Sequence, residues 1–402
     1  MIQSFNLFRD KRECSGCGAC YSVCPRKAIK LVEDGCGFVY PQIEQEKCVN
    51  CGLCKKVCNY QNNSIVGEPA VTYVGMGITP DLVRHSASGG VFAELATQFI
   101  LKGGYVCGAA FDDKWNVKHI IINNCKDLFR IQGSKYVQSE TGPCFHEIRS
   151  LLAKGEKVLF SGTPCQVDGL RGVLNSLNVS CEKLFTIDII CHGVPSSKMF
   201  HDFLHYQENK IGCEIVSFTF RDKRLGWGIN GSVEYDSPNG IKKKKCWESS
   251  TSYVYYFKRG LIFRENCYYC KYACKNRPAD ITLGDFWGIE KVHPEYIGRN
   301  KWDENNGISV AIVNSKKGQA LLNNFGQNIE LKLSSFENAA MKNHNLLRPT
   351  PCPRGRAELL RRYECNGWQA LEKSFKKLGW RRYTSQIKKM IPKRLKQLLK
   401  GL

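Results

Sequence analysis

CSGCGACYSVC at residues 14–24 has a counterpart in CVNCGLCKKVC at residues 48–58. Both stretches read C-x2-C-x2-C-x3-C, and each cysteine of the second lies 34 residues after its equivalent in the first. Three thiolates so close together can hold one face of a metal–sulfur cluster, while the fourth reaches across to a second cluster. Glycine or alanine occupies positions 16, 18, 19 and 52, which suits a backbone that wraps tightly around a bulky group. The two stretches therefore predict a duplicated metal-binding module.

The spacing is that of bacterial ferredoxins with two 4Fe-4S clusters, whose ligand sets interleave. One cluster is assigned to Cys14, Cys17, Cys20 and Cys58, and the other to Cys48, Cys51, Cys54 and Cys24. Pro25 follows Cys24 as this motif expects, whereas Asn59 replaces the second proline. A zinc site or a disulfide framework is the alternative, but the doubled spacing is far more specific than a single C-x-x-C. We expect this chain to move electrons.

Length and composition are those of a large intracellular protein. The chain has 402 residues, of which 43% are hydrophobic, so it can form two or three domains. Its 22 cysteines would indicate a disulfide scaffold only in a short secreted protein. Residues 1–13 contain a charged run and no long apolar run, so no signal peptide is expected. No stretch approaches the roughly 18 apolar residues of a membrane span. The predicted location is a reducing cytoplasm.

Basic charge is concentrated near the C-terminus. The net charge is +22, and residues 373–402 hold eleven Lys or Arg with no Asp or Glu. Nucleic acid is not favoured as a partner, because these cations alternate with Leu, Ile, Met, Trp and Tyr at roughly helical spacing. Such a segment is typical of peripheral contact with an anionic membrane or an acidic partner, and a solvated terminal helix is the alternative.

After the cysteine-rich module, short apolar strands alternate with helices. We predict strands over residues 71–75, 105–111, 119–123, 157–161 and 185–191, and helices over 90–101, 142–153 and 165–174. This alternation predicts an α/β core, and strands of more antiparallel character over 215–221, 231–235 and 308–314 make the class mixed, α+β to α/β. The expected domains are 1–60, the dicluster ferredoxin-like module; 71–345, the α/β core; and 346–402, a helical basic tail.

Further cysteines follow two of the predicted strands. GTPCQ at residues 162–166 and CHGVPS at residues 191–196 lie at carboxyl ends of strands, where open α/β sheets place their ligand crevices. Cys267, Cys270 and Cys274 form a third closely spaced group. Two buried thiols acting as small hydrophobes, and a small zinc knot, are the alternatives for the strand-end cysteines and for this group respectively. Gly226, Gly228 and Gly231 read G-x-G-x-x-G but lead into a predicted strand, so we expect no nicotinamide-binding unit there.

Together with SASGG at 86–90, QGSKYVQS at 132–139 and DITLGDFWG at 280–288, these motifs resemble the beta subunits of coenzyme F420-reducing hydrogenases and F420-dependent dehydrogenases. The resemblance extends over about residues 71–290 and makes the core a flavin-binding one. It implies FAD and a third 4Fe-4S cluster, and in several members ferredoxin clusters are fused at the N-terminus, as here. For the third cluster we expect Cys165, Cys191, Cys267 and Cys270, with Cys274 as the substitute for one of them.

The same motifs supply the expected flavin contacts. These are Ser86, Ser88, Gly89, Gly90, Gly133, Ser134, Lys135, Tyr136, Gly162, Thr163 and Asp285. Glycines at a helix start let backbone amides approach a phosphate, and a lysine suits a pyrophosphate or the charge of a reduced flavin. A simple helix cap by Ser86 or Ser88, a solvated Lys135 and a turn aspartate at Asp285 are the alternatives. No residue is assigned a catalytic role.

The parts combine into a predicted iron–sulfur flavoprotein oxidoreductase. A flavin exchanges hydride on one side and single electrons on the other, so it belongs between a hydride-exchanging small molecule and the clusters. Coenzyme F420 or a glycan precursor in polysaccharide assembly is the expected substrate, and a redox partner protein or ferredoxin the expected electron partner. The competing interpretations are a non-catalytic electron-transfer subunit of a larger redox complex and a metal-stabilised scaffold. Cluster potentials vary too widely for the sequence to set the direction of electron flow.

Overall fold

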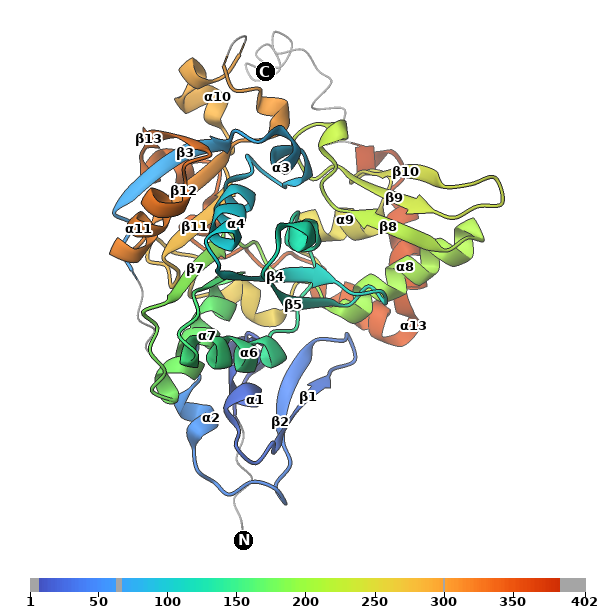
Figure 1. Cartoon of the computed structure of the whole chain (residues 1–402). Helices are drawn as coiled ribbons and strands as arrows, with labels where there is room; N and C mark the ends of the chain where they lie inside the picture. The colour runs from blue at the N-terminus through green and yellow to red at the C-terminus, as the bar shows by residue number, and fades with distance from the viewer. Residues whose placement is uncertain (1–6, 63–66, 299–300, 384–402) are drawn as a thin grey trace.

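The computed structural model describes residues 7–62, 67–298 and 301–383. An eight-stranded mixed sheet forms its centre, with strand order β13-β3-β12-β11-β7-β6-β4-β5 (Figure 1). Its strands are β3 (Val71–Gly77), β4 (Tyr105–Phe111), β5 (Val117–Ile122), β6 (Val158–Gly162), β7 (Leu184–Ile189), β11 (Ile281–Asp285), β12 (Ser309–Val313) and β13 (Ile329–Ser334). Neighbours among β4, β6, β7 and β11 pair in parallel, and the outer pairs are antiparallel. The parallel centre is buried, as its almost continuous apolar sequence requires.

Helices cover both faces of this sheet. On one face α4 (Val91–Leu101), α5 (Leu128–Ile131) and α11 (Lys316–Phe325) pack against residues such as Leu159 and Ile187. On the other face α6 (Gly142–Ala153) and α7 (Pro164–Ser176) pack against Val158 and Phe160. The short helix α3 (Pro80–His85) contacts β3 and α4. The result is a three-layer α/β core, with its apolar area shared between two buried interfaces.

The N-terminal module packs on the outside of α6 and α7 (Figure 1). It consists of α1 (Ala19–Val23), the hairpin β1 (Ile29–Glu33) and β2 (Val39–Ile43), and α2 (Leu53–Lys56). Two glycines of α7 permit this approach, because a Cβ at Gly169 would lie 2.9 Å from the Cys17 sulfur and one at Gly172 2.5 Å from the Val57 carbonyl oxygen. The Asn59 amide donates to the backbone oxygen of Asp168 at 3.0 Å, so the residue that replaces the motif's proline fastens the module to the core.

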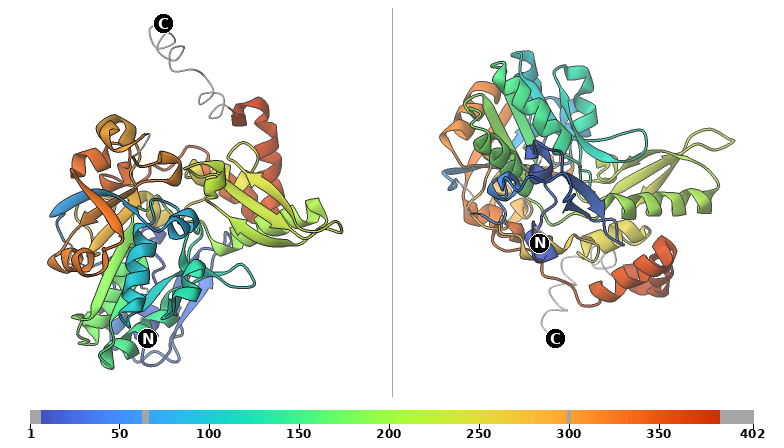
Figure 2. Two further views of the ribbon diagram at one scale, coloured as in Figure 1. Left: turned by 45° about the horizontal axis from the view of Figure 1, so that its top comes forward. Right: turned by 90° about the horizontal axis from the view of Figure 1, so that it is seen from below.

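A separate aromatic core lies beside the main sheet. The antiparallel sheet β8 (Ile215–Thr219), β9 (Gly231–Tyr235) and β10 (Lys242–Cys246) packs with α8 (Ser197–Ile211), α9 (Ser252–Lys258) and α13 (Arg356–Lys377). Figure 2 shows this sheet and α13 projecting from the main body. Phe200 and Phe203 of α8, Tyr253 of α9 and Trp368 of α13 meet edge-on or tilted within it. The remaining helices, α10 (Ile289–Val292) and α12 (Phe336–Ala340), follow β11 and β13.

The expected strands and helices between residues 71 and 314 are present, within a few residues at each end. Sequence reasoning missed β10, β11, β13, α8 and α11, and β11 lies within the DITLGDFWG motif. Gly231 begins β9 and no helix, which confirms that the glycine pattern there opens no dinucleotide-binding unit. In the part of the chain that the structure describes, no helix is long and apolar enough to cross a membrane. The predicted basic tail lies, from residue 384 onward, outside the described residues.

Candidate functional site

The eight cysteines of the N-terminal module form two groups. Cys24, Cys48, Cys51 and Cys54 line one small cavity of about 50 Å³ near the surface, where Cys51 is exposed. In the other group burial raises the pKa of Cys17 to about 12, and the neighbouring charges of Cys58 and Cys14 raise it further. Cys20 responds in the same way to burial and then to Cys17, Cys14 and Cys58. The structure thus places Cys58 with the first group and Cys24 with the second, which is the interleaved arrangement.

A third cysteine group forms where two loops meet. Cys165 lies in the first turn of α7, Cys191 follows β7, and Cys267 lies in the short 3-10 turn Glu265–Tyr269. Burial raises the pKa of Cys191 well above its ordinary value, and the charges of Cys267, Cys165 and Cys270 add to that rise. The expected substitute is turned away, since the Cys274 thiol donates to the Lys271 and Asn276 carbonyls at 3.2 and 3.1 Å.

The donor chemistry of these groups fits iron–sulfur clusters. Each of the three groups gathers four thiols, most of them buried or partly buried, whose ionisation needs a strongly positive neighbour. The charge of Cys165 also raises the pKa of Cys17, so the first and third groups are neighbours. Among residues 7–62, 67–298 and 301–383, no three His, Cys, Asp or Glu side chains are arranged to hold a single metal ion.

A buried ion pair fixes the loop that carries Cys267 and Cys270. Arg277 donates to the Asp188 carboxylate at 3.0 Å, and both side chains are almost completely excluded from solvent. The same guanidinium donates to the Ile189 carbonyl at 2.8 Å and the Tyr272 carbonyl at 2.5 Å. Burial raises the pKa of Asp188, and the charge of Arg277 opposes that rise. Arg277 therefore ties this loop to the end of β7, immediately before Cys191.

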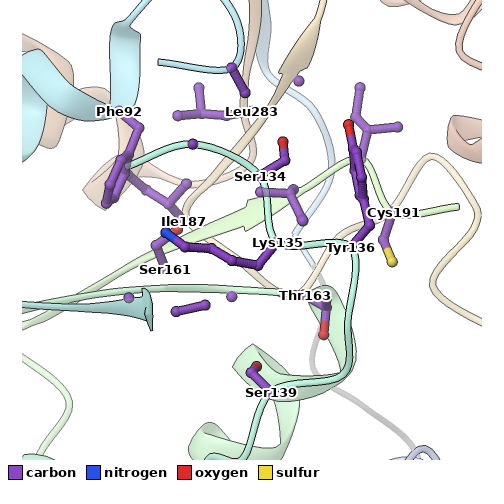
Figure 3. A pocket seen from close by; sticks show the side chains of 18 of the residues that line it. Phe92, Ser134, Lys135, Tyr136, Ser139, Ser161, Thr163, Ile187, Cys191 and Leu283 are labelled. Carbon is purple, nitrogen blue, oxygen red and sulfur yellow. The ribbon is translucent and has the colours of Figure 1, made fainter. Parts of the chain in front are cut away.

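A cavity of about 270 Å³ opens at the carboxyl ends of β4, β6, β7 and β11 (Figure 3). Cys165 and Cys191 form part of its wall, together with Ser15 and Gly16 of the N-terminal module. Ten of the eleven expected flavin contacts also line it: Ser86, Ser88, Gly90, Gly133, Ser134, Lys135, Tyr136, Gly162, Thr163 and Asp285. Gly89 does not line it; a Cβ there would lie 2.7 Å from the Gly75 carbonyl oxygen, so this glycine lets its segment pack against β3.

The start of α4 faces the cavity without a side-chain cap. Gly90 is its N-cap residue, in a left-handed conformation with φ of 83°. The Ser86 hydroxyl donates to the Leu82 carbonyl at 2.8 Å, and the Ser88 hydroxyl donates to the Ile308 carbonyl at 2.9 Å. Neither serine caps α4, so the first amides of this helix stand beside the cavity as an anion-binding end.

Lys135 crosses the cavity (Figure 3) and is not a solvated lysine. Its ammonium donates to the Arg130 and Gln132 carbonyls at 2.8 and 2.7 Å, at the C-terminal end of α5. Burial lowers the pKa of Lys135 to about 7. An ammonium has three N–H donors, so one remains for a ligand after these two bonds.

The Asp285 carboxylate is held in an ion pair rather than in a simple turn. Arg221 donates to it through both terminal nitrogens, one at 2.9 Å, and Trp227 donates to it at 2.6 Å. The Trp227 ring stacks on Trp287 with 4.5 Å between ring centres. Sequence reasoning missed Arg221 and Trp227; the glycine-rich segment rejected as a dinucleotide motif instead supplies Trp227 to this wall. The arrangement fixes an aromatic face and a compensated charge at the cavity.

A directed chain of hydrogen bonds, also unforeseen, leads to the third cysteine group. The His119 Nε2 atom lies 3.0 Å from the Ser161 carbonyl, so it carries the proton, and Nδ1 accepts from the Ser139 hydroxyl at 3.1 Å. Gln166 donates to the Ser139 oxygen at 2.8 Å and accepts from the Thr163 amide at 2.9 Å. The Thr163 hydroxyl lies 3.1 Å from the Cys165 sulfur. Burial lowers the pKa of His119 to about 4, so the whole chain is neutral.

Fold and cysteine groups together define an iron–sulfur redox protein, and comparison with known proteins gives the family. Residues 155–339 match the model of the C-terminal region of the coenzyme F420 hydrogenase/dehydrogenase beta subunit, and residues 13–62 match the model "4Fe-4S dicluster domain". The chain therefore belongs to the family of F420 hydrogenase/dehydrogenase beta subunits and carries a dicluster 4Fe-4S domain before the family region. These matches confirm the resemblance inferred from the motifs.

Two relatives show how far the similarity extends. Over 225 residues the chain is 24% identical to a subunit of the F(420)H(2) dehydrogenase of Methanosarcina mazei, which is 52% of this chain and 60% of that protein. Over 339 residues it is 29% identical to an uncharacterized protein of Methanocaldococcus jannaschii, which is 73% of this chain and 86% of that protein. A structure of the F420-reducing NiFe hydrogenase complex from Methanosarcina barkeri aligns over 77% of this chain and 92% of its own, at 15% identity and a TM-score of 0.42. That score is too low to carry an argument.

Proposed function

We propose that this chain is a flavin-dependent iron–sulfur oxidoreductase that exchanges hydride with a small molecule and single electrons with a partner protein. The observation that carries the proposal is the shared cavity. The expected flavin contacts and two cysteines of the third group, Cys165 and Cys191, line the same space. A flavin, when bound, exchanges hydride with organic molecules and single electrons with iron–sulfur centres.

The residues of the cavity have properties that would hold such a group. The uncapped amides of α4 and the remaining N–H of Lys135 would bind phosphate oxygens or another anionic atom of the ligand. Tyr136 is held in place by stacking on Phe257, with 4.3 Å between ring centres. The Arg221–Asp285 pair fixes the wall beside Trp287. These contacts orient a ligand between an apolar sheet end and the cysteines.

The order of the cysteine groups supports an electron path from the cavity to the surface. We assign a further 4Fe-4S cluster to Cys165, Cys191, Cys267 and Cys270, beside the cavity. The group containing Cys17 is its neighbour, and the group containing the exposed Cys51 lies near the surface. A redox partner protein would bind at that exposed end. This is the physical basis for an enzyme, since a hydride site and a surface outlet are both present.

Anaerobic purification with measurement of iron, acid-labile sulfide and flavin on one sample tests the proposal. We expect about twelve irons per chain, from three clusters of four, and one flavin. Cys191→Ser should lower the iron content by about four, whereas the matched control Cys125→Ser, at an exposed cysteine outside all three groups, should retain it. About eight irons and no flavin in the wild-type protein would refute the flavin and the third cluster together.

Substrate and location extend the proposal. A hydride-exchanging molecule, either coenzyme F420 or a glycan precursor in polysaccharide assembly, is the proposed substrate, and the cytoplasm the proposed location. The basic segment 373–402 would hold the enzyme against an anionic membrane. Loss of binding to anionic vesicles after deletion of residues 373–402 is the expected result, and unchanged binding would remove that contact from the proposal. The competing function is that of a non-catalytic electron-transfer component; a partner that co-purifies in equal amount, with no turnover by the isolated chain, would favour it.

A further inference from the structure

We infer that Arg264 is a positioning residue that joins the first and third cysteine groups and raises the reduction potential of the clusters on both sides. Its effect on the first cluster rests on the dicluster domain, and its effect on the third rests on the proposed function. Arg264 lies three residues before Cys267, and its own amide donates to the Val194 carbonyl at 2.8 Å, three residues after Cys191. Its backbone is thus part of the third group's loops.

The side chain of Arg264 points out of these loops to the first group. Its Nε donates to the Cys14 carbonyl at 2.9 Å, and a terminal nitrogen lies 3.6 Å from the Cys14 sulfur. The other terminal nitrogen donates to the Gln138 side-chain oxygen at 3.3 Å, and the guanidinium covers the Tyr40 ring at 4.0 Å. Gly16 makes room for it: a Cβ there would lie 3.0 Å from the central carbon of the guanidinium, and its φ of 67° also favours glycine.

The charge of Arg264 has no carboxylate partner within ion-pair distance in the described part of the chain. Its exposed fraction is 0%, and a fully buried cation is very costly without an anion nearby. The nearest candidates for that anion are the thiolates of the two cysteine groups. Burial raises the pKa of Cys165 and the pKa of Cys267, and the positive charge of Arg264 opposes both rises. The guanidinium therefore sits where two anionic clusters would compensate it.

A fixed positive charge at this position has a defined redox consequence. Reduction adds one negative charge to an iron–sulfur cluster, so a buried cation stabilises the reduced form and raises the potential. Hydrogen bonds to the ligand sulfur act in the same direction. Because Arg264 interacts with both groups, it raises both potentials together. Electron exchange between the two clusters then stays close to balanced while both become easier to reduce.

Redox titration of the purified protein, followed by electron paramagnetic resonance of the reduced clusters, tests this inference. In Arg264→Gln the ratio of reduced to oxidised cluster at a fixed potential should fall at least tenfold, which is 59 mV for a one-electron couple. In Arg264→Lys, which keeps the charge, the ratio should stay within about threefold. Arg356→Gln is the matched control, because that buried arginine is already paired with Glu265 at 2.7 Å; its ratio should not change.

A second variant covers a failure of Arg264→Gln to hold its clusters. Gln138→Glu leaves Arg264 in place and sets a carboxylate against it, so the ratio should fall in the same direction. An unchanged ratio in a fully iron-loaded Arg264→Gln or Gln138→Glu protein would overturn the inference. A wild-type protein with only two clusters would instead refute the proposed third cluster and leave the effect on the first cluster to be measured.

Discussion

Gly169→Ala tests whether the N-terminal module owes its position to the glycines of α7. The added Cβ would lie 2.9 Å from the Cys17 sulfur, 3.1 Å from the Cys17 Cβ and 3.6 Å from the Ala19 Cβ. Because such atoms prefer roughly 3.5–4.0 Å, the loop of the first cysteine group must retreat by several tenths of an ångström. Overpacking of this kind costs about 1–3 kcal/mol, and the better helix propensity of alanine returns about 1 kcal/mol.

The expected net loss in the free energy of unfolding is therefore modest, about 0–2 kcal/mol. The functional effect should be larger, because the strain falls on Cys17, a ligand of the first cluster. We expect about four irons per chain to become labile. Iron content and the unfolding temperature, measured anaerobically, check both statements. Asn175→Ala is the control, since Asn175 lies on the exposed side of α7. A Gly169→Ala protein that keeps all its iron as firmly as Asn175→Ala would refute the docking argument.

Four further results are expected. Arg277→Met should lower the free energy of unfolding by about 3–5 kcal/mol in urea denaturation, because Asp188 is left buried without its partner; a loss below about 1 kcal/mol would contradict this. The folded-state pKa of His119 is about 4 against an ordinary 6.5, so the unfolded chain binds the proton first and stability falls as pH drops from 6.5 to 4, by about 3 kcal/mol; this loss should be absent from His119→Gln. Lys135→Met should bind flavin more weakly than wild type in a fluorescence titration, and the difference should shrink as pH rises through about 7, where Lys135 loses its charge; equal affinity at low pH would exclude the contact. Cys274→Ser should retain its full iron content in colorimetric analysis, since this thiol faces backbone carbonyls.

Local patterns made the cysteine module and most of the sheet predictable. Ligand spacing in C-x2-C-x2-C-x3-C is a property of a few consecutive residues, so it can be recognised without a fold. The strands β4, β6 and β9 and the helix α6 were also predictable, because apolar periodicity reports which faces are buried. β11 was missed since its five residues sit between aspartates, and it becomes a strand by pairing with β7 and β12. The tendency of its own sequence would not have made it one.

The cysteine-rich module, the family and the strand-end position of the cavity were therefore determined by the sequence alone. Only the tertiary structure decided which cysteines meet across the two modules, and which charges accompany them. Arg264 reaches the Cys14 sulfur over 250 positions of chain, and Asn59 and Gly169 acquire their roles only where α7 meets the N-terminal module. The physical reason is that ligand spacing and periodicity are local, whereas the burial of a cation beside two thiolate groups depends on how separate segments pack.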